Sequence, residues 1–196
     1  MERPEQLHNR ILSLLILCFL ACENSMVDVY DARFLNLKTK RGLTYNNNIL
    51  FNGISLKLNK NGDTLSVEEY LSGKKNGKWK NFYPNGQLRE SRFFDKGIKK
   101  GDHFFYFPSG QLKFHYQLDN DVYHGFRKAW SPEGKLISYH NFKNGYEEGS
   151  QKVWYDNGKI KNNYIIKNGR RYGLLGTKNC INVLSLIHIS EPTRPY

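Results

Sequence analysis

The chain has little cysteine, no long apolar run and a shortage of acidic residues. Only 3 of its 196 residues are Cys, and two of them, Cys18 and Cys22, lie within or directly after an N-terminal apolar run. If Cys18 is removed with a signal peptide and Cys22 is lipidated, only Cys180 remains, and an internal disulfide framework is excluded. The apolar run, residues 11–21, is shorter than the roughly 20 residues that a membrane-spanning helix needs. The 18 Asp and Glu against 30 Lys and Arg favour anionic partners.

Motifs of the common catalytic and metal sites are also missing. The histidines show no metal-ligand spacing, and neither a nucleophile elbow nor a phosphate-binding loop is present. The acidic pairs Glu68–Glu69 and Glu147–Glu148 lie beside turns, without a partner base. We therefore expect a protein that is not an enzyme and that needs no cofactor and no metal.

The N-terminus is typical of an export signal. Arg3 and Arg10 precede the apolar run, which has the length of a signal-peptide core. The run ends in "FLAC", with the small Ala21 before Cys22, and this resembles the lipobox of bacterial lipoproteins. The resemblance implies a signal peptide at 1–21, acylation of Cys22 and a spacer at 22–40. An ordinary cleaved signal or a buried N-terminal helix is the alternative.

If the lipobox resemblance holds, the protein is an exported, membrane-anchored lipoprotein on the periplasmic or outer-membrane side of a bacterial envelope. The opposite end, "LSLIHISEPTRPY" at 184–196, resembles a translated sequencing adapter. We expect this tail to be non-native and to take no part in the fold. A genuine tail is the alternative.

The middle of the chain repeats with a period of 24 residues. Five blocks align without a gap: 54–77, 78–101, 102–125, 126–149 and 150–173. An opening strand at 41–53 precedes them, and 174–183 begins like a degenerate or truncated sixth repeat. The whole repeat domain is expected at 41–173.

Glycines mark three positions in each block, with Asp121 as the one exception. We expect them to be the turn glycines of the repeat: Gly62, Gly73, Gly77, Gly86, Gly97, Gly101, Gly110, Gly125, Gly134, Gly145, Gly149, Gly158, Gly169 and Gly173. "YPNG", "FPSG" and "SPEG" place proline second and glycine fourth, which predicts a type I turn followed by a residue with positive φ. Each block is therefore predicted to form a β-hairpin. Because a lone hairpin is marginal in water, the blocks are expected to stack.

Apolar residues recur at the fifth, eleventh and seventeenth positions of the blocks. They predict a repeat core of Leu58, Phe82, Tyr106, Trp130, Trp154, Leu88, Leu112, Leu136, Ile160, Tyr70, Phe94, Leu118, Phe142 and Ile166. The second position varies and is partly polar. It is the predicted binding face, with Trp79, His103, Arg127 and Gln151. Solvated surface is the alternative for these four.

The pattern Gly-x-Trp-Lys-x-Phe-Tyr-x-Asn-Gly-x-Leu resembles the MORN-repeat variant. More closely, with "RGLTYNNNILFNG" at 41–53, the chain is similar to the bacterial YwqK-type proteins, a family described as antitoxin components of toxin–antitoxin systems. The resemblance implies an all-β, elongated single-layer ribbon, or solenoid, of stacked β-hairpins. It also implies action by binding rather than catalysis.

Two kinds of partner follow from these features. The resemblance implies an unknown partner protein, a toxin if the antitoxin description applies, so that the chain would serve as an immunity component at the envelope. Residues 54–173 carry 22 Lys and Arg against 12 Asp and Glu, and this charge predicts anionic phospholipid as the alternative partner. No nucleic acid is expected, because the aromatic residues fall in the apolar columns and the signal segment directs the chain away from it.

Overall fold

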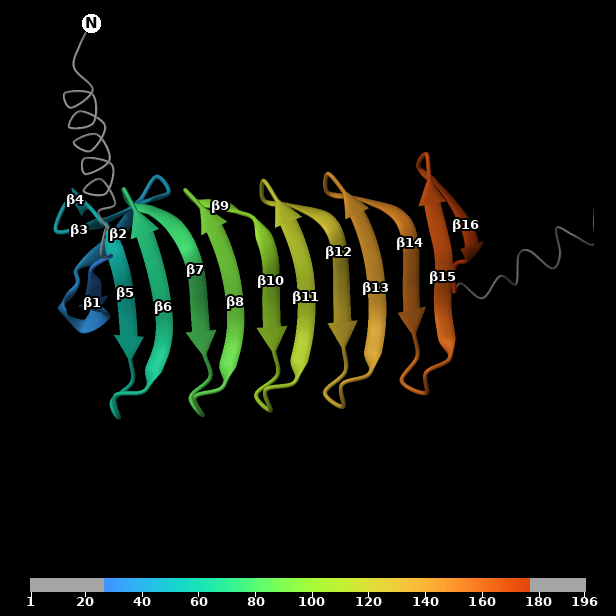
Figure 1. Cartoon of the computed structure of the whole chain (residues 1–196), viewed down its shortest axis with the longest axis horizontal. Helices are drawn as coiled ribbons and strands as arrows, with labels where there is room; N and C mark the ends of the chain where they lie inside the picture. Colours follow the sequence, from blue (N-terminus) through green and yellow to red (C-terminus); the bar gives the residue numbers. More distant parts are fainter. Residues whose placement is uncertain (1–26, 177–196) are drawn as a thin grey trace, which may run out of the picture.

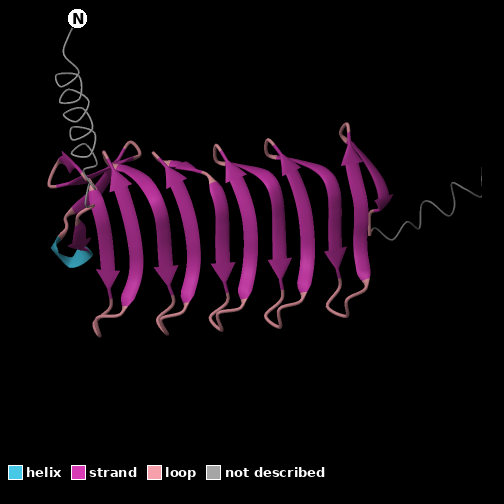
Figure 2. Ribbon diagram, in the orientation of Figure 1, coloured by secondary structure: helices cyan, strands magenta, loops and turns pink. Residues whose placement is uncertain are grey.

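A computed structural model describes residues 27–176 of the chain. The predicted signal peptide, Cys22, most of the degenerate sixth repeat and the adapter-like tail lie outside these residues. Within them the protein is built from β-strands and one short 3₁₀ helix, η1 (Ala32–Phe34), without an α-helix (Figure 2). No helix in this part of the chain is long and apolar enough to cross a membrane.

The strands form one long ribbon (Figure 1). In chain order it contains β1 (Val29–Asp31), β5 (Gly53–Leu58), β6 (Thr64–Leu71), β7 (Lys74–Phe82), β8 (Leu88–Asp95), β9 (Ile98–Lys99), β10 (Gly101–Tyr106), β11 (Leu112–Asp119), β12 (Val122–Trp130), β13 (Leu136–Lys143), β14 (Tyr146–Trp154), β15 (Ile160–Lys167) and β16 (Arg170–Leu174). From β5 onward neighbours in sequence pair antiparallel, except that β9 is a side strand on β8. The predicted fold class, an open ribbon of consecutive β-hairpins, is confirmed.

A second, smaller sheet caps the N-terminal end of the ribbon. It contains β2 (Leu37–Lys40), β3 (Leu43–Asn46) and β4 (Ile49–Leu50). Leu35 and Leu37 pack against the buried rings at the start of the ribbon. The Thr44 N–H donates to the Gly73 carbonyl at 2.7 Å, and the Phe51 N–H donates to the Thr44 carbonyl at 3.0 Å. These bonds join the cap to the first hairpin.

One end of each hairpin is a turn that glycine completes. In the second hairpin the Gly86 N–H donates to the Tyr83 carbonyl at 2.9 Å, and the Tyr83 N–H donates to the Gln87 carbonyl at 2.8 Å. Gly86 has φ of +80°. Proline at position 84 suits the first corner of this turn because its ring holds φ near −65°.

The opposite ends of the hairpins are two-residue turns with positive φ at both positions. Asn144 and Gly145 have φ of +51° and +85°, which is the signature of a type I′ turn. Asn120 and Asp121 make the same turn with φ of +49° and +66°. Asp121 also binds the previous repeat, because its Oδ1 accepts from the Lys99 N–H at 3.1 Å. This bond explains how the one block without glycine keeps the turn.

Asp121→Gly is expected to change the free energy of unfolding by less than about 0.5 kcal/mol. Relief of the left-handed strain, about 1 kcal/mol, offsets the lost side-chain hydrogen bond of similar size. Asp121→Ala loses the bond and keeps the strain, so it should cost about 1 kcal/mol. Denaturant unfolding of both variants checks this. Equal losses in the two would show that the Lys99 contact does not compensate for the strain.

The glycines that close the blocks are not in turns, which corrects the prediction for them. Gly77, Gly125 and Gly149 lie inside β7, β12 and β14, opposite points where the strand register shifts. At each shift the strand with the glycine has three residues between two successive pairs where its partner has one, which is an enlarged β-bulge. All three have positive φ. Gly101 begins β10 and Gly173 lies within β16. The structural hairpin therefore runs from one two-residue turn to the next and is offset from the sequence block.

Candidate binding surfaces

The ribbon has two faces, because side chains alternate along each strand. We name the first the ladder face. It carries Tyr70, Trp79, Phe94, His103, Tyr116, Phe142, Gln151 and Tyr164. We name the second the lysine face. It carries Lys80, Ser91, Phe104, His115, Lys128, Tyr139 and Lys152.

Aromatic rings run along the ladder face in a continuous series. Each ring contacts the next in the order Tyr30, Phe51, Tyr70, Trp79, Phe94, His103, Tyr116, Tyr123 and Phe142, with centroid separations between 4.9 and 6.5 Å. Rings at these separations attract one another beyond the burial of their surface. This series is the core of the N-terminal and central ribbon.

Trp79 lies inside this series and is only 7% exposed. Its indole Nε1–H donates to the Glu69 carbonyl at 2.8 Å, and the Lys75 ammonium lies 4.4 Å from the ring centroid. Tyr70 and Phe94 flank it at 5.0 and 5.2 Å. Both the indole N–H and the ring of Trp79 therefore have partners, which come from its own repeat and from the preceding one.

His103 occupies the equivalent place in the next hairpin and is 0% exposed. Its ring stacks on Tyr116 at 5.4 Å, and neither ring nitrogen has a hydrogen-bond partner within residues 27–176. Burial lowers the pKa of His103. The Lys100 backbone and the Asp102 carboxylate raise the pKa of His103, and the cations Arg92 and Lys99 lower it further. The imidazole is thus a buried ring with a lowered pKa, at the position that Trp79 occupies one repeat earlier.

These positions correct the predicted binding face. Trp79, His103 and Gln151 are buried, and Arg127 is half-buried with its guanidinium 5.5 Å from the Phe114 ring. The physical reason is the pairing within each hairpin: His103 lies opposite Tyr116, and Gln151 lies opposite Tyr164. Gln151 is also satisfied by polar partners, since its Oε1 binds His140 Nδ1 at 2.9 Å and its Nε2 donates to the Asn141 carbonyl at 2.8 Å. Trp79, His103 and Gln151 therefore vary in residue type while they are buried, so the variation does not indicate a solvated surface.

The three predicted apolar columns are buried to different degrees. In the seventeenth column Tyr70, Phe94, Leu118 and Ile166 are buried, and Phe142 is half-buried. The fifth column, Leu58, Phe82, Tyr106, Trp130 and Trp154, is half-buried throughout. In the eleventh column Leu88 and Leu112 are half-buried, but Leu136 and Ile160 are 37% and 50% exposed. The prediction of Leu136 and Ile160 as core is therefore wrong.

Two cations on the ladder face, Arg92 and Arg171, have acidic partners. Arg92 donates to Glu90, which is 6% exposed, at 2.6 Å, and Asn81 donates to the same carboxylate at 2.7 Å. Arg92 also lies 5.2 Å from the Phe105 ring. At the C-terminal end Arg171 pairs with Glu147 at 3.6 Å. These two charges are therefore compensated, whereas Arg127 on the same face forms no salt bridge within residues 27–176.

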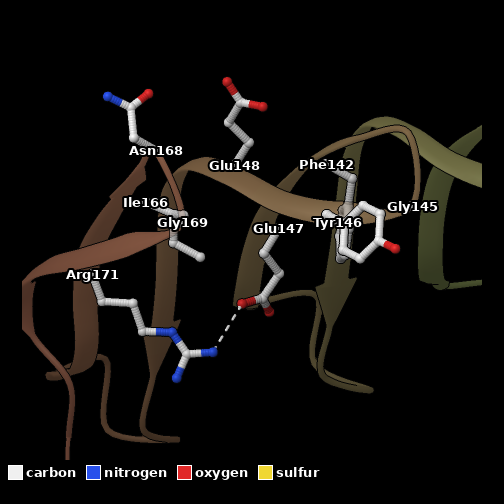
Figure 3. A pocket seen from close by; sticks show the side chains of 9 residues that line it. All are labelled: Phe142, Gly145, Tyr146, Glu147, Glu148, Ile166, Asn168, Gly169 and Arg171. Carbon is white, nitrogen blue, oxygen red and sulfur yellow. Dashed lines mark ion pairs between the residues drawn. The ribbon is translucent and has the colours of Figure 1, made fainter.

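Figure 3 shows a hollow of about 540 Å³ between the ends of the last two hairpins. Ile166 and Phe142 line its apolar part, and the Glu147–Arg171 pair spans its polar part. Tyr164 lies 3.4 Å from the same carboxylate. A smaller hollow of about 270 Å³ lies beside Arg92, Lys99 and Tyr123. Glu147 and Arg171 pair with each other in the larger hollow, and Glu148 adds a second carboxylate to its lining.

The lysine face carries an unbroken row across the ribbon. Direct cross-strand pairs join its members in the order Leu56, Val67, Lys80, Ser91, Phe104, His115, Lys128, Tyr139, Lys152, Asn163 and Leu174. Directly opposite residues of a strand pair point to the same face. The row contains no acidic residue. We call its central part, from Lys80 to Lys152, the lysine row.

Rings and charges alternate in the lysine row. His115 stacks on Phe104 at 4.2 Å, and its Nε2 lies 2.7 Å from Asp102 Oδ1. The Lys128 ammonium lies 4.6 Å from the Phe126 ring and 5.7 Å from the Tyr139 ring. Sequence reasoning missed this row, although Lys80, Lys128 and Lys152 share the third position of their blocks. The third position directly follows the second position of the predicted binding face, so it points to the opposite side of the strand. The recurrence of lysine at this position was the available signal.

Residues 27–176 contain no group of three His, Cys, Asp or Glu side chains that could hold a metal ion. The MORN repeat variant matches two segments, residues 75–96 and 147–168. Each match covers nearly all of one structural hairpin, β7–β8 and β14–β15. No curated protein matches the chain. The ribbon thus contains two segments similar to the MORN repeat variant, and this repeat indicates a repeat-based interaction module.

Proposed function

We propose that the protein is a non-catalytic, lipid-anchored interaction module that binds a partner protein through its ribbon. The observation that carries this proposal is the single-layer sheet, whose lysine face has cations and rings in register but no second layer within residues 27–176. Long one-layer repeat ribbons present extended surfaces of this kind to their partners.

The anchor in this proposal is Cys22. Its acyl group would hold the chain on the periplasmic or outer-membrane side of the envelope. The spacer would be shorter than residues 23–40, because β1 and β2 already place Val29–Asp31 and Leu37–Lys40 in the fold. One acyl chain gives only marginal membrane binding, so more than one chain or a basic patch is needed. Metabolic labelling with a radioactive fatty acid should mark the wild-type chain and not Cys22→Ser. Label retained in Cys22→Ser would remove the anchor from the proposal.

The partner in this proposal is a protein at the envelope, in the manner of an immunity protein that protects its own cell. The sequence resemblance to antitoxin components supports this reading, and export restricts it to a toxin that acts outside the cytosol. The full chain in a mild zwitterionic detergent should capture one discrete protein from envelope extracts, and this protein should stay bound at high salt. Capture of no protein at either salt would contradict the proposal.

Anionic phospholipid is the second candidate partner. The observation that favours it is the charge of residues 54–173, with 22 basic and 12 acidic side chains. Each basic residue near an anionic membrane contributes about 1 kcal/mol to binding. Flotation of the full chain with phosphatidylglycerol vesicles, compared with phosphatidylcholine vesicles, tests this candidate. Equal recovery with the two lipids would exclude it.

A further inference from the structure

The lysines of the lysine row have no ion-pair partner among the residues that the structure describes. Lys80 is exposed, and Lys128 and Lys152 are half-buried. None of the three forms a salt bridge within residues 27–176, whereas Arg92 and Arg171 on the other face do. Asp102, two residues from Phe104 on β10, has its Oδ1 2.7 Å from the Nε2 of His115. The row therefore presents uncompensated positive charge.

The spacing of these charges is regular. Neighbouring strands lie about 4.8 Å apart, so Lys128 on β12 and Lys152 on β14 are about 10 Å apart across the ribbon. Lys80 on β7 is four strands from Lys128, which corresponds to about 19 Å. Phe104 lies midway between them, two strands from each. A ligand that follows the row thus meets Lys, Phe, Lys and Lys at equal intervals.

A polyproline II helix has the matching repeat. It has 3 residues per turn and rises about 3.1 Å per residue, so its side chains return to one side every 9.3 Å or so. This is close to the two-strand interval of about 10 Å. A β-strand would not fit as well. An interval of about 10 Å corresponds to three of its residues, and residues three apart point to opposite sides of a strand. Aromatic surfaces such as Phe104 with the stacked His115 also suit this extended, preformed conformation.

We propose that the lysine row binds an acidic polyproline II segment of the partner protein, with acidic residues at its first, seventh and tenth positions and an apolar residue at its fourth. This inference rests on the proposed function and names the chemistry of the partner. A nucleic acid strand, with a phosphate about every 3.4 Å, would leave most of its charge unpaired here. A membrane surface would engage the basic residues of the whole face and not one line of them.

The test uses two fluorescein-labelled peptides of equal composition and the full chain in zwitterionic detergent. The register peptide is Glu-Pro-Pro-Leu-Pro-Pro-Glu-Pro-Pro-Glu, and the shuffled peptide is Pro-Glu-Glu-Pro-Leu-Pro-Glu-Pro-Pro-Pro. Fluorescence anisotropy at low salt should give at least tenfold tighter binding of the register peptide. Equal affinities of the two peptides would overturn the inference, because the row would then recognise the charge of a peptide and not the spacing of its acidic residues.

Two triple variants locate the binding. Lys80→Gln with Lys128→Gln and Lys152→Gln should weaken the register peptide at least tenfold. The matched control, Lys60→Gln with Lys143→Gln and Lys167→Gln, removes the same charge from exposed positions outside the row and should weaken it less than threefold. Equal loss in both variants would overturn the inference. The inference would also be overturned if the row variant lost binding to phosphatidylglycerol vesicles but still bound the register peptide.

A charge exchange guards against an effect on folding. Because Lys80 is exposed, the Lys80→Glu variant should fold normally. It should bind the register peptide more weakly than the wild type does. A peptide with lysine at its first position should recover at least half of the lost binding free energy, and no recovery would contradict the register. If both peptides fail while the envelope protein is still retained at high salt, this inference falls and the proposed function stands. If that capture also fails, the proposed function falls as well.

Discussion

Trp79→Ala is expected to lower the free energy of unfolding by about 3–5 kcal/mol, the range measured when large aromatic side chains are truncated in protein cores. Trp79 is 7% exposed and lies between the Tyr70 and Phe94 rings. The substitution removes both ring contacts. It also leaves the Glu69 carbonyl without the indole hydrogen bond.

Trp130→Ala and Trp154→Ala are the matched controls, because both tryptophans are half-buried in the fifth column. Each should cost less than half as much as Trp79→Ala, since part of the ring is already in water. Urea unfolding followed by circular dichroism measures all three. If the three losses are equal, the ring series of the ladder face is not the main core.

His103→Phe is expected to raise the free energy of unfolding by roughly 1–3 kcal/mol near neutral pH. The substitution replaces two buried ring nitrogens without partners by carbon, which removes the desolvation penalty of unsatisfied polar atoms. Phenylalanine keeps a flat ring for the contact with Tyr116. The position already holds the larger Trp79 in the preceding hairpin, so the ladder accommodates a larger apolar ring there.

The same residue makes stability depend on pH. Because burial lowers the pKa of His103 in the folded chain, the unfolded chain binds more protons below the ordinary histidine pKa of about 6.5. The stability associated with His103 is therefore complete above that pH and is lost as the pH falls toward the lower folded-state pKa. The groups that face the ring and influence it are Arg92, Lys99, Asp102 and Tyr116.

Urea unfolding at pH 7.5 and at pH 5.5 separates the two effects. The wild type should lose more stability between these values than His103→Phe does. His124→Phe, at an exposed position on β12, is the control and should keep the wild-type dependence. If His103→Phe retains the full pH dependence, another group causes it.

The repeat and its turns could be predicted because glycine and proline act locally. Glycine marks many positions of positive φ in this sequence, and Gly86 and Gly145 are examples. Ser72 and Lys96 also have positive φ, and their residue types do not indicate it. The same reasoning placed Gly77 in a turn, although it lies in a bulge. A bulge and a turn both need positive φ, so the residue type alone does not distinguish them.

Burial at the second position of the repeat could not be read from one column. His103 and Gln151 are buried in cross-strand pairs with Tyr116 and Tyr164. This pairing links two columns that are 13 residues apart. Variation in one column then looks like exposure unless its cross-strand partner is known.

The lysine row depends on register in the same way. Its members belong alternately to the third and the fourteenth position of the repeat. Only the cross-strand pairings from Val67 to Asn163 bring these two columns into one line. A one-residue slip would send every one of these side chains to the other face. The register, and not the composition, creates the surface.

Site-specific photo-crosslinking in intact cells tests the central claim most directly, that the ribbon binds its partner through the lysine face. A photoreactive residue in place of Ser91 would lie between Lys80 and Phe104, and one in place of Ser138 would lie on the ladder face. Both serines are half-buried in strands, so they are matched in setting. We predict one discrete crosslinked protein from position 91 and none from position 138. Crosslinks of equal yield from both positions, or a protein crosslinked from position 138 alone, would contradict this account.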